Sequence, residues 1–366
     1  CSADADCEGY TSRCSDPSKT TEDSCGTCSD PAKTTQSTCG DCSELGYQAD
    51  AVASHTAPDT SNWGNYVCTS PATSGTFIFN GDCTLSAEVT LTGDLTLVGS
   101  DTTTLKTMTA ATNKRHFRLG TTATNNAGRT LTLWYVKLTG GNIQTEPLNN
   151  NNRAIAGSIL IWTSGGTLNL YYSEIIGNEA KKVSGYGGAV SAIGASSTNK
   201  NAIVNVYNSI IKDNKARTGA AFDVRQAVLN VYDSHFDNNL GEFGGVMYAI
   251  ESDVTMTNTI ISNHVVTTSS DFSGIAIGSD GDNSFTFRQV SFINSDVIGS
   301  LGSGNTFTLV NTLVPTHKTA VTGDFTIPTF LQPSSSLLYE WQTCADNPCS
   351  VAPHTGTCSA VDSSDV

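Results

Sequence analysis

The residues best suited to chemistry lie in the second half of the chain, where carboxylates and an arginine recur at short intervals. They are Asp213, Asp223, Arg225, Asp233 and Asp237. Successive strands of a stacked sheet would bring such acids and bases side by side, as general acid–base catalysis requires. Asp223 and Arg225 are separated by one residue and should share an outward face, where a solvated ion pair is the competing interpretation. We favour the ion pair over catalysis.

Other patterns expected of a polysaccharide-cleaving enzyme are missing from the sequence. It contains no Asp-Asp pair, no Gly-His-Gly and no Arg-Ile-Lys, and its six histidines form no cluster in sequence. Calcium binding between Asp213 and Asp237 stays open, although no Asp-x-Asp-x-Asp-Gly loop supports it. We therefore expect no enzymatic activity, no catalytic residue, no metal ligand and no cofactor.

Twelve cysteines form the second chemical signal, and they lie toward the two ends of the sequence. Nine precede residue 84 and three follow residue 343: Cys1, Cys7, Cys14, Cys25, Cys28, Cys39, Cys42, Cys68, Cys83, Cys344, Cys349 and Cys358. The segment from Cys14 to Cys25 is repeated from Cys28 to Cys39, with a period of 14 residues. We expect disulfides formed in an oxidising, extracellular setting, some of them between subunits. A zinc site at Cys25-x-x-Cys28 or Cys39-x-x-Cys42 is the alternative.

The charge balance limits the classes of partner. Only 14% of the 366 residues are charged, and 34 acidic against 19 basic residues give a net charge of −15. Because polyanions bind basic surfaces, this balance argues against nucleic acid and anionic membranes, and a neutral sugar surface or a calcium ion fits better. No apolar run approaches the roughly 18 residues that a membrane-spanning helix needs, so we expect no membrane insertion.

The elements that must position these residues are strands. Short β-branched runs separated by Gly, Asn and Asp extend from about residue 75 to 330, with almost no helical periodicity. Four stretches share one frame and begin at Leu170, Val206, Val231 and Met256. Their common apolar column is Ile175, Ile211, Phe236 and Ile261, continued by Phe292. A constant motif at variable intervals predicts stacked strands, because extra residues can leave through loops without shifting the next repeat.

An asparagine ladder accompanies the apolar column. Its members are Asn178, Asn214 and Asn239. Asparagine tolerates a left-handed backbone at a sharp bend, and stacked amides can hydrogen-bond along the axis of the stack. We therefore predict a structural turn ladder at these positions.

The repeated strand, the Asn-Ser-x-apolar-x-x-Asn turn and the Gly-Gly pair before the next strand resemble right-handed parallel β-helix proteins of the pectin-lyase-like superfamily. The Gly-Gly pair stands within residues 186–190 and 243–248. The pattern is most similar to the repeats of polymorphic outer-membrane proteins and related surface adhesins. This resemblance implies an all-β fold, with a parallel β-helix solenoid at 68–335 flanked by small disulfide-rich modules at 1–67 and 336–366.

The last three cysteines carry a second resemblance. Cys344, Cys349 and Cys358, with Asn-Pro before the second, resemble the opening half of an EGF-like module. That resemblance implies a Cys344–Cys358 bridge and a fourth cysteine, absent from this sequence, for Cys349. A β-helix combined with EGF-like cysteines is also similar to extracellular proteins of algae and other protists, including those that build flagellar mastigonemes.

The function we predict is a non-catalytic structural subunit of an extracellular filament or cell-surface appendage. It would self-associate into a homo- or hetero-polymer, with other extracellular glycoproteins as further partners. A polysaccharide-active, lyase-like enzyme and a carbohydrate-binding adhesin are the alternatives on the same fold. An adhesin would bind sugars on a ladder of exposed rings, for which the candidates are Tyr135, Tyr172 and either Tyr207 or Tyr232. Half-buried packing of these rings is the competing interpretation.

Overall fold

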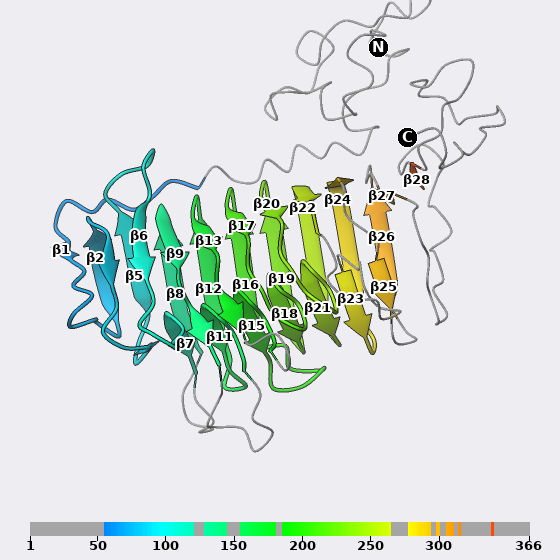
Figure 1. Ribbon diagram of the computed structural model, residues 1–366, viewed down its shortest axis with the longest axis horizontal. Helices are drawn as coiled ribbons and strands as arrows, with labels where there is room; N and C mark the ends of the chain where they lie inside the picture. Colours follow the sequence, from blue (N-terminus) through cyan, green and yellow to red (C-terminus); the bar gives the residue numbers. More distant parts are fainter. Residues whose placement is uncertain are drawn as a thin grey trace, which may run out of the picture.

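The computed structural model describes residues 55–120, 128–144, 154–180, 185–264, 277–293, 298–300, 305–310, 314–315 and 338–339. Within these ranges the protein is all-β, and its named strands pair in parallel (Figure 1). No helix among the described residues is long and apolar enough to cross a membrane. For the described residues the prediction of an all-β fold is confirmed, since no helix occurs among them and their sheets are extensively parallel.

The largest sheet has two arms that run side by side along the molecule. The first arm is β1 (Gly64–Asn65), β2 (Gly75–Phe79), β5 (Leu95–Gly99), β8 (Arg129–Trp134), β12 (Gly166–Tyr171), β16 (Ala202–Tyr207), β19 (Ala227–Tyr232), β22 (Asp253–Ser262), β24 (Ser284–Ile293) and β26 (Thr306–Val310). The second arm is β3 (Cys83–Thr84), β6 (Lys106–Thr109), β9 (Val136–Thr139), β13 (Glu174–Ile176), β17 (Ile210–Lys212) and β20 (His235–Asp237). The long strands β22 and β24 join the arms, because β22 pairs with both β19 and β20.

A second sheet takes one strand from each repeat. It consists of β4 (Val89–Thr90), β7 (Phe117–Leu119), β11 (Ile159–Ile161), β15 (Val190–Ile193), β18 (Phe222–Arg225), β21 (Met247–Ile250), β23 (Ile277–Asp280) and β25 (Ile298–Ser300). Two small parallel pairs complete the fold: β10 (Asn142–Ile143) with β14 (Glu179–Ala180), and β27 (Val314–Pro315) with β28 (Leu338–Tyr339). Each repeat of the chain therefore adds one strand to the second sheet and one to each arm.

Equivalent positions of the sequence repeats lie directly beside one another. Leu170 pairs with Val206, Val206 with Val231, and Val231 with Met256, as the shared frame predicted. The predicted apolar column is also confirmed, since its members pair from Ile175 through Phe292 and are at most 3% exposed. In-register stacking explains the repeat, because each inward position packs on its equivalents in the neighbouring repeats.

Variable repeat length is absorbed at the corners. The single residue Gln226, with a positive φ of 52°, connects β18 to β19. One repeat earlier, residues 194–201 make the same connection between β15 and β16 and contain the bridge between Ser196 and Asn199. The paired strands stay in register on both sides of the corner. This is the behaviour that the unequal sequence intervals predicted.

The core lies where inward side chains of both arms and the second sheet meet. Strands of the first arm alternate, so that Leu168 and Leu170 are buried while Asn169 and Tyr171 are only partly exposed. Phe222 of the second sheet packs edge-on against Phe236 of the second arm, with ring centroids 5.6 Å apart. Because one cluster contains residues from β2 through β24, the apolar core runs continuously along the stack.

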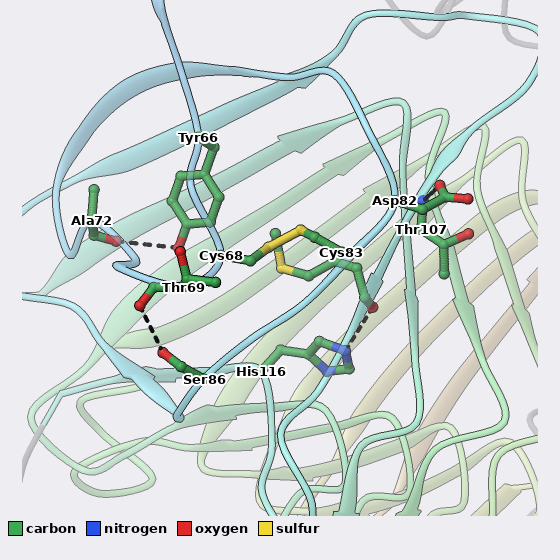
Figure 2. The surroundings of a disulfide bond; sticks show 10 residues. Tyr66, Cys68, Thr69, Ala72, Asp82, Cys83, Ser86, Thr107 and His116 are labelled. Atoms are coloured by element: carbon green, nitrogen blue, oxygen red, sulfur yellow. Dashed lines mark hydrogen bonds between the residues drawn. A yellow bond between two sulfur atoms is a disulfide. The ribbon is translucent and has the colours of Figure 1, made fainter.

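One disulfide closes the first repeats. Cys68 and Cys83 are bonded, and both sulfur-bearing side chains contact the core (Figure 2). Nearby, the Tyr66 hydroxyl donates to the Ala72 carbonyl oxygen at 3.3 Å. The other cysteines lie outside the described residues: Cys1, Cys7, Cys14, Cys25, Cys28, Cys39, Cys42, Cys344, Cys349 and Cys358.

Candidate functional site

The predicted acid–base pair is present, but it is not solvated. Asp223 and Arg225 of β18 point to the same side, and the arginine Nε lies 2.9 and 3.1 Å from the two carboxylate oxygens. The Ser191 hydroxyl donates to the same carboxylate at 2.9 Å. Asp223 is fully buried, whereas the side chain of Arg225 is 23% exposed. The expectation of a water-exposed pair is therefore wrong.

Aromatic rings explain how an outward pair became buried. The segment before β15 places the Tyr186 ring against the Arg225 guanidinium, 4.2 Å from the ring centroid. Tyr248 occupies the position next to Asp223 in β21 and is itself only 9% exposed. Burial raises the pKa of the Asp223 carboxyl, while the charge of Arg225 and the hydrogen bonds from Ser191 and Arg225 oppose that rise. The Asp223 carboxylate is therefore shielded from solvent, while Arg225 stays partly exposed.

The other three aspartates of the region do not join this pair. Each accepts a hydrogen bond from an asparagine in the following repeat: Asp213 from Asn238, Asp233 from Asn258, and Asp237 from Asn263. They lie on turns and on the second arm, whereas Asp223 lies in the second sheet. Asp213 borders a shallow surface hollow, which Glu179 and Lys215 also line. The structure therefore separates the acidic residues that the sequence groups together.

A histidine, a serine and an aspartate do meet on the second arm. The His235 Nε2 lies 2.8 Å from the Ser262 hydroxyl, which donates to Asp237 Oδ1 at 2.8 Å. In a nucleophilic triad the serine donates to the histidine, and the carboxylate accepts from the other ring nitrogen. Burial favours the neutral acid of Asp237, but hydrogen bonds from Asn263 and Ser262 outweigh it and lower its pKa. This order of hydrogen bonds ties the serine to a weakly basic carboxylate and does not activate it.

The predicted turn asparagines form a buried ladder. Asn214 Oδ1 accepts from the backbone and side-chain nitrogens of Asn178 at 3.0 and 3.1 Å. Asn239 Oδ1 accepts in the same way from Asn214 at 3.1 and 3.0 Å. His264 continues the ladder, with its Nδ1 3.3 Å from the backbone nitrogen of Asn239. All three asparagines are fully buried.

The left-handed residue of this turn is not the asparagine. Positive φ angles occur one position earlier, at Gly177, Asp213, Asn238 and Asn263. The ladder asparagines instead use their amides to satisfy backbone groups of the neighbouring repeats, for example the carbonyl oxygens of Leu138 and Ile175. Their role in the turn is hydrogen bonding across repeats, because backbone groups buried at a corner need partners.

A second polar row lies on the outer side of the first arm. Asn230 donates to Asn205, and Asn205 to Asn169, each at 2.9 Å. Asn169 in turn donates to the Thr132 hydroxyl at 3.3 Å. This row was not predicted, although the asparagine stands between two apolar residues in 168–170, 204–206 and 229–231.

Four aromatic rings stack beside that polar row, and we call Trp134, Tyr171, Tyr207 and Tyr232 the aromatic ladder. Successive ring centroids are 4.0, 5.0 and 5.1 Å apart, with interplanar angles of 14°, 5° and 7°. Tyr135 and Tyr172 stack separately at 5.3 Å. The predicted ladder of Tyr135 and Tyr172 with Tyr207 or Tyr232 is therefore corrected, because the bend residues 135 and 172 carry their rings to another column.

The aromatic ladder also receives a residue from far earlier in the sequence. The His55 ring lies 4.8 Å from Tyr171 and 4.2 Å from Tyr207, tilted by just over 50° to each. Partial burial raises the pKa of both tyrosines. No local sequence signal points to this contact, because the two partners are more than a hundred residues apart.

In the ranges that the structure describes, no three His, Cys, Asp or Glu side chains form a group that could hold a metal ion. Comparison with protein-family models, curated proteins and solved structures gave no match.

Proposed function

We propose that the chain is a right-handed parallel β-helix of the pectin-lyase-like kind, and that it acts as a non-catalytic structural subunit of an extracellular filament or cell-surface appendage. One observation carries this proposal: polar and aromatic side chains form continuous ladders along the direction in which the strands stack. Such ladders join each repeat to the next and favour a stiff rod. Ten strands in the first arm, spaced by about 4.8 Å, give a rod about 45 Å long.

The acid–base chemistry of the chain supports this proposal over a lyase-like enzyme. General acid–base catalysis needs a titratable group within hydrogen-bond reach of the substrate. Asp223 is fully buried, and its carboxylate is already bonded to Arg225 and Ser191. Asp237 has a lowered pKa, which weakens it as a base at neutral pH. Both groups fit structural roles.

The stacking of the rings argues against sugar binding by ring faces. Sugars pack against exposed aromatic faces, but neighbouring rings cover both faces of Tyr171 and Tyr207. An adhesin using this surface would instead hydrogen-bond its glycan through the outer amides and tyrosine hydroxyls. That second candidate predicts that Tyr171→Phe combined with Tyr207→Phe abolishes binding on a glycan array.

The extracellular location and the assembly form part of the same proposal. The Cys68–Cys83 disulfide fits an oxidising compartment, and the ten remaining cysteines offer further bridges within or between copies. Partners would be further copies of the chain or other extracellular glycoproteins.

Electron microscopy of the native, unreduced protein tests the proposal, together with non-reducing electrophoresis of the same sample. We expect regular filaments and covalent multimers that collapse when the disulfides are reduced. The same protein blocked with a thiol-alkylating reagent after reduction is the control. Dispersed monomers over a wide range of concentrations would overturn the structural role.

A further inference from the structure

The segment before the first strand, residues 55–63, lies lengthwise along the stack, and we call it the strap. It ends where β1 begins at Gly64, and its first residue contacts the rings of Tyr171 in β12 and Tyr207 in β16. The strand order β1-β2-β5-β8-β12-β16 puts that contact four to five strand spacings from β1, or about 22 Å. Nine extended residues span up to about 30 Å, so the strap reaches it without strain. Figure 1 shows the strap running from β1 across the neighbouring repeats.

The strap is held weakly. None of its residues is buried, and Thr56, Pro58, Asp59, Ser61 and Asn62 are exposed. Its hydrogen bonds in the described part of the chain are internal, from Ser61 N to Asp59 Oδ1 and from Trp63 N to the Thr60 carbonyl oxygen. The His55 ring joins the strap to the aromatic ladder of the sheet. An aromatic contact of this kind contributes about 1 kcal/mol, which thermal motion breaks readily.

We propose that the strap exchanges between copies, so that His55 of one molecule docks on the aromatic ladder of a second copy and links the two. The inference rests on the proposed structural function and names the contact that joins subunits. Exchange replaces the contact within one molecule by the same contact between two molecules. Its free-energy cost is therefore small when the copies are concentrated or already aligned. The docking surface is the edge of the Tyr171 and Tyr207 rings, and its occupant is the strap of another copy.

The position of the ladder suits such an exchange. β12 and β16 are the fifth and sixth of the ten strands of the first arm. In a copy stacked end to end beyond β1, the same two rings lie five to six strand spacings away, or about 26 Å. Nine residues reach this distance once the turn closed by Trp63 N and the Thr60 carbonyl oxygen opens. A strap anchored at β1 can therefore dock on either of two equivalent pairs of rings, one in its own molecule and one in the stacked copy. The two pairs lie at nearly equal distances from β1.

Photo-crosslinking with isotope labels tests the exchange on the full chain. A photoreactive benzoylphenylalanine replaces His55, and equal amounts of ¹⁴N-labelled and ¹⁵N-labelled protein are mixed before assembly. After irradiation, mass spectrometry identifies the peptides linked to the strap. With full exchange, about half of the pairs between the strap and the peptides containing Tyr171 or Tyr207 combine one light and one heavy partner.

The outcomes separate this inference from the proposed function. Mixed-isotope pairs support strap exchange, whereas pairs of a single isotope in material that electron microscopy shows as filaments overturn the exchange and leave the structural role standing. Single-isotope pairs in dispersed monomers overturn both. As a second measurement, His55→Ala should lower the yield of filaments several-fold, and Thr56→Ala, at the exposed neighbouring position, should leave it unchanged. Equal filament yields for the two variants would contradict the exchange.

Discussion

The ion pair of Asp223 and Arg225 joins a fully buried carboxylate to a mostly buried guanidinium. Replacing Asp223 by Ala leaves a mostly buried guanidinium without its counter-ion. Breaking a buried pair on one side costs about 3–5 kcal/mol. We therefore expect Asp223→Ala to lower the free energy of unfolding by that amount in urea denaturation.

The neighbouring serine provides the matched control for this prediction. Ser191→Ala removes one of the hydrogen bonds to the same carboxylate but keeps the ion pair. Loss of a hydrogen bond to a charged group costs about 1.5–3 kcal/mol, so this variant should be clearly milder. If both variants lowered the free energy of unfolding equally, the charge of Asp223 would make no contribution to stability.

Two buried histidines make the protein sensitive to acid. His116 Nε2 contacts the Met108 and Thr139 carbonyl oxygens, each at 3.0 Å, and its Nδ1 accepts from the Ser158 hydroxyl. Burial lowers the pKa of His116 to about 4, and it does the same for His264. Between pH 6.5 and 4 the unfolded chain binds protons that the folded chain does not, so stability falls as the pH falls.

We expect the free energy of unfolding to decrease by about 3 kcal/mol for His116 between these pH values. Chemical denaturation at a series of pH values measures it. His116→Gln no longer titrates and should show a shallower slope. A stability that stays level from pH 6.5 to 4 would contradict the prediction.

At the scale of the elements, the two asparagine rows differ in burial. One row lies in the turns that follow the second arm, and the other lies on the outer side of the first arm. The amides of Asn214 are fully buried and bond to both neighbouring repeats, whereas the Asn205 row is half-buried on the outside. Replacement of Asn214 removes the acceptor of the buried Asn178 backbone nitrogen and one of the two acceptors of the Asn178 side-chain nitrogen. Each orphaned buried donor costs about 1–3 kcal/mol.

We therefore predict that Asn214→Ala destabilises the protein by about 2–4 kcal/mol. Asn205→Ala should cost about 1 kcal/mol or less, because water can replace its hydrogen bonds on the outer face. Thermal unfolding followed by circular dichroism compares the two. If the outer variant were the more damaging one, the buried ladder would not be the stronger of the two connections between repeats.

At the scale of the whole molecule, strand pairing joins each repeat to its neighbours, so a local change should stay local. The Cys68–Cys83 bridge closes a loop of 15 residues at the β1 end of the stack. A loop of this size stabilises by about 3 kcal/mol through the unfolded state. Removing it should loosen the first repeats and leave the middle of the stack unaffected.

Hydrogen exchange of the combined variant Cys68→Ser and Cys83→Ser measures this effect. We expect faster exchange in β2, β5 and β6, and unchanged protection in β16, β17 and β19. Uniformly faster exchange along the whole chain would show that the stack unfolds as one cooperative unit.

The amino-acid sequence alone was enough to predict the all-β class, the shared frame of the repeats, the inward column through Ile211 and Phe236, and the positions of the stacked asparagines. These follow from local pattern, because in-register parallel strands place like residues beside like residues, and the pattern is therefore written into every repeat. The outer row through Asn205 obeys the same logic, because Asn169, Asn205 and Asn230 stand one residue before the shared frame.

Which outward residues stay exposed depends on contacts between segments that are distant in the sequence. Tyr186 covers Arg225, and His55 meets Tyr207, through the paths of connecting segments that carry no repeat. The Cys68–Cys83 pairing is of the same kind, because nine early cysteines allow many pairings and spacing does not choose among them. Strand pairing is encoded in short periodic runs, whereas burial of the outer faces depends on where long connections return, and no local pattern specifies that.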